Sequence, residues 1–248
     1  MNIRKHIPNL LTLLNLLSGT IATIYAVNND LVTAAYFVFL GIFFDFFDGF
    51  AARLLKVGGE LGKQLDSLAD VVTSGVVPGI VLYQLLTSDK SQFSIKNIDI
   101  TWGDSNFETL PYIGLLFTLA AAYRLAKFNI DERQSSSFIG LPTPAATLVV
   151  LSLPLILESG ISYTITDIIL NKWLLIALTV LLSILMNIEI SLFSLKFKNY
   201  SWKDNKMKFL FLISIVILLI LLKYLAIPIA ILLYVLLSVI SNMRREKN

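Results

Sequence analysis

Long apolar segments separated by short polar breaks make up most of the chain. The pattern is plainest toward the C-terminus, where residues 209–222 and 225–240 follow each other almost without interruption. An α-helix needs about 20 mostly apolar residues to cross the hydrocarbon core of a bilayer. The pattern predicts eight such helices, at residues 7–27, 31–53, 62–86, 107–127, 141–159, 172–190, 208–223 and 225–241.

Composition indicates the same class of protein. Hydrophobic residues make up 56% of the 248 positions, charged residues only 15%, and the mean hydropathy is +0.77. Soluble domains carry about 25% charged residues. We therefore expect an all-α, multi-pass integral membrane protein surrounded by bilayer lipid. The absence of cysteine excludes disulfides and thiolate metal sites.

The basic residues predict the orientation in the membrane, because cytoplasmic loops are enriched in lysine and arginine. Most of the 20 basic residues fall on one predicted side, namely Arg4, Lys5, Arg53, Lys56, Lys63, Arg124, Lys127, Arg133, Lys196, Lys198, Lys203, Lys206, Lys208, Arg244, Arg245 and Lys247. Both termini should then be cytoplasmic. This asymmetry also accounts for the net charge of +3, so we expect no nucleic-acid partner.

Four aspartates interrupt the apolar pattern, Asp45 and Asp48 in the second predicted helix and Asp66 and Asp70 in the third. A carboxylate at the bilayer centre costs roughly 2.5–3.5 kcal/mol, so cationic partners are expected. Residues three or four apart share a helix face, so a hairpin of these two helices would point all four carboxylates into one cleft. Such a cluster could bind two divalent cations and hold a phosphoryl group in transfer. Its place at a predicted cytoplasmic turn indicates a site that opens to the cytoplasm.

Small and basic residues lie between these acids. Gly49, Ala52 and Gly62 have little side chain, which lets the backbone approach a ligand or another helix closely. Arg53 follows one helical turn after Gly49, where it could hold a phosphate. Helix packing alone would explain each small residue singly, but it does not explain the four acids.

The complete spacing resembles the signature of the CDP-alcohol phosphatidyltransferase family, without departure at Asp45, Asp48, Gly49, Ala52, Arg53, Gly62, Asp66 and Asp70. The resemblance implies two Mg²⁺ or Mn²⁺ ions and CDP-diacylglycerol as the donor. It implies that Asp70 is both a metal ligand and the general base, and that Gly49 and Arg53 contact the CDP diphosphate. The other implied metal ligands are Asp45, Asp48 and Asp66.

The resemblance also implies a six-helix core around a polar cleft. We expect this core within residues 1–190 and a pair of transmembrane helices within residues 191–248. That pair would either pack around the core or form a homodimer contact. The segment 7–12 resembles the opening of the family, which implies that Asn9 and Thr12 lie near the nucleotide.

Two later segments resemble the phosphatidylserine synthase branch of the family. They are residues 123–129 and 138–146, with Lys127 in place of an arginine and Thr143 in place of a serine. A serine acceptor brings a carboxylate that a guanidinium can bind, although anchoring of a helix end would also explain these basic residues. The residues assigned to the acceptor are Arg124, Lys127 and Asn129.

The sequence therefore predicts transfer of a phosphatidyl group from CDP-diacylglycerol to L-serine, with release of CMP. Glycerol 3-phosphate or inositol phosphate stays open as the acceptor, which would require a further basic cluster at the cleft. A divalent-cation transporter could also carry acids within its membrane helices. Against transport, the acids crowd near one face of the membrane rather than mark a path through it.

Overall fold

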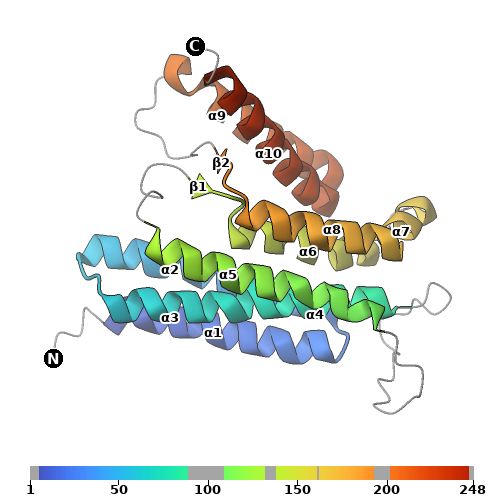
Figure 1. Cartoon of the computed structure of the whole chain (residues 1–248), viewed down its shortest axis with the longest axis horizontal. Helices are drawn as coiled ribbons and strands as arrows, with labels where there is room; N and C mark the ends of the chain where they lie inside the picture. The colour runs from blue at the N-terminus through green and yellow to red at the C-terminus, as the bar shows by residue number, and fades with distance from the viewer. Residues whose placement is uncertain (1–5, 89–108, 132–137, 161, 193–201, 246–248) are drawn as a thin grey trace.

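The computed structural model describes residues 6–88, 109–131, 138–160, 162–192 and 202–245. This part of the chain is almost entirely helical, and its first long helices lie side by side (Figure 1). The expectation of an all-α membrane protein is thereby confirmed. Some basic residues that predict the orientation lie outside the described residues, namely Arg4, Lys5, Arg133, Lys196, Lys198 and Lys247.

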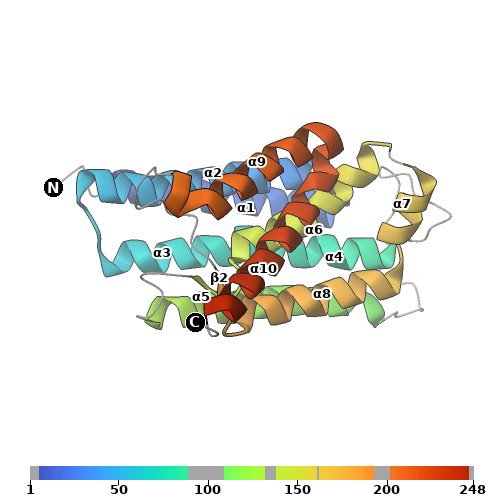
Figure 2. The same cartoon turned by 90° about the horizontal axis from the view of Figure 1, so that it is seen from above.

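Helices α1 (His6–Val27) and α2 (Leu31–Leu55) form a hairpin at one side of the bundle (Figure 2). Asp30 caps the second helix, because its carboxylate accepts a hydrogen bond of 3.1 Å from the backbone N–H of Thr33. The buried positions of the two helices include many small residues, which allow close packing in a membrane: Ser18, Gly19, Ala22, Ala26, Ala34, Ala35 and Gly41.

The third predicted span is one helical stretch that changes pitch in its middle. It consists of α3 (Glu60–Val71), a π-helical turn η2 (Val72–Val76) and α4 (Val77–Thr87). Such a turn frees backbone carbonyls from the regular helical pattern. The carbonyl of Ser74 accepts a 2.8 Å hydrogen bond from the Thr147 hydroxyl, and that of Gly75 accepts one of 2.9 Å from Thr118. These bonds hold the turn directly after Asp70 in place.

The next elements complete the bundle. In chain order they are η4 (Leu110–Leu115), α5 (Leu116–Ile130), α6 (Thr143–Glu158), α7 (Tyr163–Ile169) and α8 (Lys172–Asn187). Most residues of α6 are buried, so this helix lies in the interior. The sequence does not predict the short antiparallel pair β1 (Phe138–Ile139) and β2 (Ser191–Leu192), in which Phe138 lies opposite Leu192.

The C-terminal elements form a separate hairpin against the bundle (Figure 1). They are α9 (Trp202–Leu222), the 3₁₀ turn η6 (Lys223–Leu225) and α10 (Ala226–Arg245). Lys223 has a φ of 49°, and the chain turns back at this point. Helix α10 packs on α6 and next to β2.

The number of membrane spans is lower than predicted when it is judged by length and composition. Among the described residues, five helical stretches are long and apolar enough to cross a membrane, or six if the bent pair of α7 and α8 counts as one span. Helix α6 has only 16 residues, and by this measure residues 211–240 form a single apolar stretch. The predicted count of eight is therefore not confirmed.

Candidate active site

Three of the four predicted aspartates converge. Asp45 and Asp48 come from α2 and Asp66 from α3, and one carboxylate oxygen of each lies within 4.8 Å of the others. Asp48 is 7% exposed, and Oδ1 of Asp66 is buried without a hydrogen-bond partner. Carboxylates so close and so poorly hydrated repel one another unless a cation or a shared proton lies between them. The set fits a hard divalent cation such as Mg²⁺ or Mn²⁺, which prefers carboxylate oxygens.

Asp70 lies beside this cluster and is buried like Asp48. Its side chain is 8% exposed, and its charge interacts repulsively with Asp66 and attractively with Arg124 of α5. Its Oδ1 accepts a hydrogen bond of 3.1 Å from Nδ2 of Asn15. The structure thus places all four acids at one site, with Asp70 set apart from the three whose oxygens converge.

Helix α1 supplies hydrogen-bond donors to both buried carboxylates. The Thr12 hydroxyl donates to Oδ2 of Asp48 at 2.5 Å, and Asn15, almost one turn further along, donates to Asp70. Thr12 is predicted near the nucleotide, whereas Asn15 is not among the predicted site residues. The signal that could have found Asn15 is its spacing of three from Thr12, which places both polar side chains on one face of an apolar helix.

A pocket of about 540 Å³ opens beside the aspartates, where the start of α1, the end of α2 and the start of α3 meet. Two basic residues outside the predicted set, His6 and Lys63, contribute to its lining. Arg53 is exposed and does not line this pocket. The predicted residues that do line it are Asn9, Thr12, Asp48, Gly49, Ala52, Gly62 and Asp66.

The two predicted glycines that line the pocket, Gly49 and Gly62, have different surroundings. A Cβ added at Gly49 would meet nothing within 4 Å, whereas one added at Gly62 would lie 3.3 Å from Oδ1 of Asn9. Packing within the protein therefore does not require glycine at position 49, and the open space there is available to a ligand. Gly62 allows α3 to approach α1 closely.

Of the three residues predicted to bind the acceptor, Arg124 is the one whose charge interacts with one of the acids, Asp70. Arg124 is 7% exposed, its Nη1 donates to the Thr143 hydroxyl at 2.9 Å, and its Nε is buried without a partner. A buried guanidinium N–H without a partner is costly, so a further acceptor group is expected near it.

The other two residues connect α5 to neighbouring helices. Lys127 forms an ion pair of 3.0 Å with Glu189, just beyond α8. Asn129 donates from Nδ2 to the Ser67 hydroxyl of α3 at 2.7 Å, and its backbone carbonyl accepts a hydrogen bond from Lys63. The side chains of Lys127 and Asn129 thus have partners on neighbouring elements, whereas Nε of Arg124 has none.

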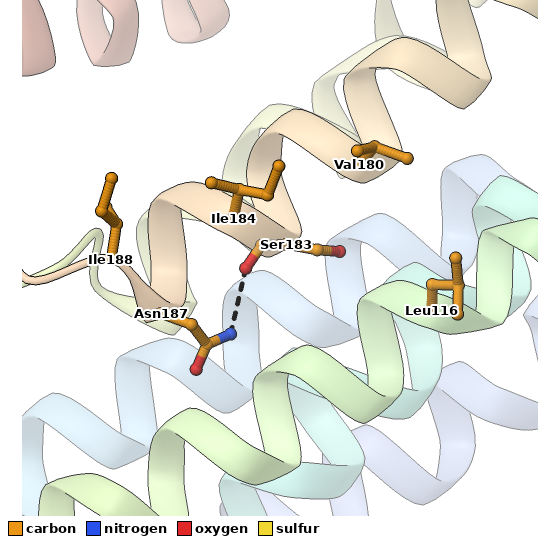
Figure 3. Close-up of a pocket in the computed structure, with 6 residues that line it drawn as sticks. All are labelled: Leu116, Val180, Ser183, Ile184, Asn187 and Ile188. Carbon is orange, nitrogen blue, oxygen red and sulfur yellow. Dashed lines mark hydrogen bonds between the residues drawn. The ribbon is translucent and has the colours of Figure 1, made fainter.

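A second pocket, of about 520 Å³, lies between α5 and α8 (Figure 3). Asn187 donates from Nδ2 to the backbone carbonyls of Ser183 at 3.0 Å and Ala120 at 3.1 Å. The lining of this second pocket is mostly apolar and includes none of the predicted site residues. It consists of Leu116, Val180, Ser183, Ile184, Asn187 and Ile188. The acidic site therefore remains the candidate active site.

Comparison with known proteins identifies relatives. The curated CDP-diacylglycerol–serine O-phosphatidyltransferase of Bacillus subtilis is 34% identical over 165 residues, which cover 63% of this chain and 82% of that protein. The protein of the same name from Helicobacter pylori (strain J99) is 32% identical over 146 residues, covering 58% and 55%. The archaetidylserine synthase of Methanothermobacter thermautotrophicus is 32% identical over 149 residues, covering 59% and 56%. The chain thus spans about half the length of the last two relatives.

A model of the CDP-alcohol phosphatidyltransferase family matches residues 5–185. The matched segment is well over half of the chain and contains all four aspartates and the pocket beside them. Helices α9 and α10 lie beyond it. The chain therefore belongs to the CDP-alcohol phosphatidyltransferase family.

Proposed function

We propose that this chain transfers the phosphatidyl group of CDP-diacylglycerol to L-serine, which yields phosphatidylserine and CMP. The observation that carries the proposal is the convergence of Asp45, Asp48 and Asp66 beside an open pocket lined by Gly49 and Gly62. Family membership and the names of the relatives support this chemistry and a serine acceptor.

The nucleotide of the donor occupies the 540 Å³ pocket in this proposal. The small residues Gly49 and Ala52 let the diphosphate approach the backbone of α2, and Arg53 at the exposed rim contributes positive charge. Asn9 and Thr12 of α1 and Gly62 of α3 form the opposite wall. The two acyl chains extend from the site into the surrounding bilayer.

In this proposal the aspartates would hold two Mg²⁺ or Mn²⁺ ions, with Asp45, Asp48, Asp66 and Asp70 as ligands. Bound divalent cations supply positive charge that neutralises the diphosphate of the donor. The partnerless Oδ1 of Asp66 and the mutual proximity of the carboxylates support this assignment.

Asp70 accepts the proton of the serine hydroxyl. The hydroxyl oxygen then forms a bond to the phosphorus that carries diacylglycerol, while the bond between that phosphorus and the bridging oxygen of CMP breaks. The products are phosphatidylserine, CMP and a proton that Asp70 releases to water. The buried position of Asp70 next to the convergent acids, rather than among them, suits this role.

Arg124 binds the carboxylate of serine through its unpaired Nε, which lies within electrostatic reach of Asp70. This places the acceptor between the base and the guanidinium. Lys127 and Asn129 act less directly, because Glu189 and Ser67 already engage their side chains.

The site faces the cytoplasm in this proposal, and both termini lie on the same side. The pocket opens at the end of the bundle that also carries Arg53, Lys56 and Lys63, in agreement with the predicted enrichment of basic residues on the cytoplasmic side. Soluble serine and the released CMP would then exchange with the cytoplasm directly.

The test is an assay of purified protein with CDP-diacylglycerol and Mg²⁺ or Mn²⁺, in which labelled serine, glycerol 3-phosphate and inositol phosphate are offered separately. We expect CMP and labelled lipid from serine alone, and no product after chelation of the metal. Product from another acceptor would keep the chemistry and overturn the assignment of Arg124. No CMP with any acceptor, together with metal uptake into proteoliposomes, would favour a divalent-cation transporter.

A further inference from the structure

Asn15 is a fully buried amide in the middle of α1 that touches the candidate base. Its side chain is 0% exposed, and its Nδ2 donates to Oδ1 of Asp70 at 3.1 Å. The bond joins residues 55 positions apart, so α1 reaches across to the end of α3 at this point. Its Oδ1 is buried without a hydrogen-bond partner.

The surroundings fix the amide in this orientation. A Cβ added at Gly41 of α2 would lie 2.9 Å from Oδ1 of Asn15 and 2.7 Å from Cγ2 of Thr73, so only glycine leaves room there. The Thr73 hydroxyl, in the π-helical turn, donates to the backbone carbonyl of Asn15 at 3.2 Å. A Cβ at Gly19 would in turn collide with Thr73. Two glycines and one hydroxyl thus hold Asn15 against Asp70.

Such an arrangement is unfavourable if its only purpose is packing. A buried amide with an unpaired oxygen destabilises a fold, and leucine would fill a similar volume without that cost. A donor aimed at one oxygen of a buried carboxylate has a chemical use, because it restrains rotation of the carboxylate and thereby fixes where its second oxygen lies. Thr12 makes the equivalent contact to Asp48 from the same face of α1.

We propose that Asn15 is a positioning residue, which holds Oδ1 of Asp70 so that Oδ2 receives the proton of the acceptor hydroxyl. This inference rests on the proposed function, because it requires that Asp70 is the general base that Asn15 positions. Gly41 and Thr73 are part of the same arrangement, since they determine where the amide lies. Asn15 itself touches neither the nucleotide pocket nor the three convergent carboxylate oxygens.

The test is the replacement Asn15→Leu, with Asn15→Ser as a second variant that removes the same contact with less bulk. We expect kcat for serine to fall about 10–100-fold, as for other residues that orient a reacting group. The KM values for serine and CDP-diacylglycerol, and the affinity for CDP, should stay unchanged. The solvent deuterium isotope effect on kcat should rise, because proton transfer becomes rate-limiting.

Gln84→Leu is the matched control. Gln84 is also a buried amide that connects helices, since its Nε2 donates to the backbone carbonyls of Ala26 and Val27, at the opposite end of α1 from the pocket. Its replacement should lower thermal stability and leave kcat and the isotope effect unchanged. Gly41→Ala should reproduce the kinetic changes of Asn15→Leu, because the new methyl group displaces the amide.

The outcomes separate this inference from the function on which it rests. If the wild-type protein forms no product from serine, the proposed function fails before any variant is compared. If the wild type is active and an Asn15 variant that binds CDP normally keeps wild-type kcat, only the positioning role is overturned. Loss of CDP binding in both Asn15→Leu and Asn15→Ser would assign Asn15 to the fold and overturn the role as well.

Discussion

The hairpin of α1 and α2 and the hairpin of α9 and α10 are both strongly apolar, but they distribute their residues differently. In α2 the aromatic residues Phe43 and Phe46 are 54% and 63% exposed, whereas Gly41 and Asp48 are buried. In the C-terminal stretch only 11% of the most apolar window is buried. Its buried polar side chain is Ser238, whose hydroxyl donates to the backbone carbonyl of Tyr234 in the same helix.

The difference between the two hairpins shows which residues of a membrane protein indicate a functional site. Apolar side chains that face lipid cost nothing, so they identify a membrane helix but not a site. Polar side chains buried between helices are costly and must be satisfied by partners or ligands. Thr12, Asn15 and Asp48 meet this description in the first region, and the predictions below test whether function depends on these residues and on the acids that they face.

The largest effect is expected from Asp70→Asn, which removes the proposed base and keeps the shape of the side chain. General bases contribute about 10²–10⁴-fold to the rate, so turnover should fall by that factor. Binding of CDP should be largely kept, because Asp70 does not line the nucleotide pocket. The measurements are CMP release and calorimetric titration with CDP.

Asp30→Asn at the start of α2 is the control, because asparagine caps a helix equally well. Retained turnover in Asp70→Asn would exclude it as the base.

A large effect is also expected from Asp45→Asn and Asp66→Asn, which each remove one of the convergent carboxylates. The concentration of Mg²⁺ or Mn²⁺ that gives half-maximal activity should rise at least about 10-fold. Loss of a residue that only hydrogen-bonds a metal ligand already lowers metal affinity by about that factor. Excess metal should restore part of the activity. An unchanged metal titration in both variants would contradict the cation site.

An intermediate effect is expected from Arg124→Gln, which keeps a polar side chain but removes the charge. A hydrogen bond to a charged group contributes about 1.5–3 kcal/mol, which corresponds to an increase of roughly 10–100-fold in the KM for serine. The KM for CDP-diacylglycerol should stay unchanged and serves as the internal reference. Equal increases in both KM values would assign Arg124 to general support of the site rather than to the acceptor.

The smallest effect on turnover is expected from removal of residues 202–248, which deletes α9 and α10 but keeps the β1–β2 pair. Because the deleted hairpin supplies none of the predicted site residues, kcat should change by less than about 3-fold. The thermal midpoint in detergent should fall, since α6 loses its contact with α10. Loss of turnover in a folded truncated protein would show that the hairpin of α9 and α10 is needed for the geometry of the site.

Local features of the sequence were sufficient for much of the fold and for the centre of the site. The first helices begin and end close to their predicted limits, because hydrocarbon thickness and turn residues such as Asp30 act locally. Helical periodicity places Asp45 and Asp48 on one face, and three acids converge as expected. The total of eight spans is not confirmed, because α6 has only 16 residues and residues 211–240 count as one apolar stretch by length and composition. The boundary at residue 190 stays a prediction.

The sequence alone thus determined that this protein is a bundle of membrane helices with an acidic centre, because both conclusions depend on residues within one helix or one hairpin. Only the tertiary structure decided which distant residues meet: Asn15 with Asp70, Lys127 with Glu189, and the hydroxyls of Thr118 and Thr147 with the π-helical turn. These pairs are separated by 43 to 73 positions in the chain. Their contacts depend on how whole helices pack, and the spacing of residues along a single helix contains no information about that packing.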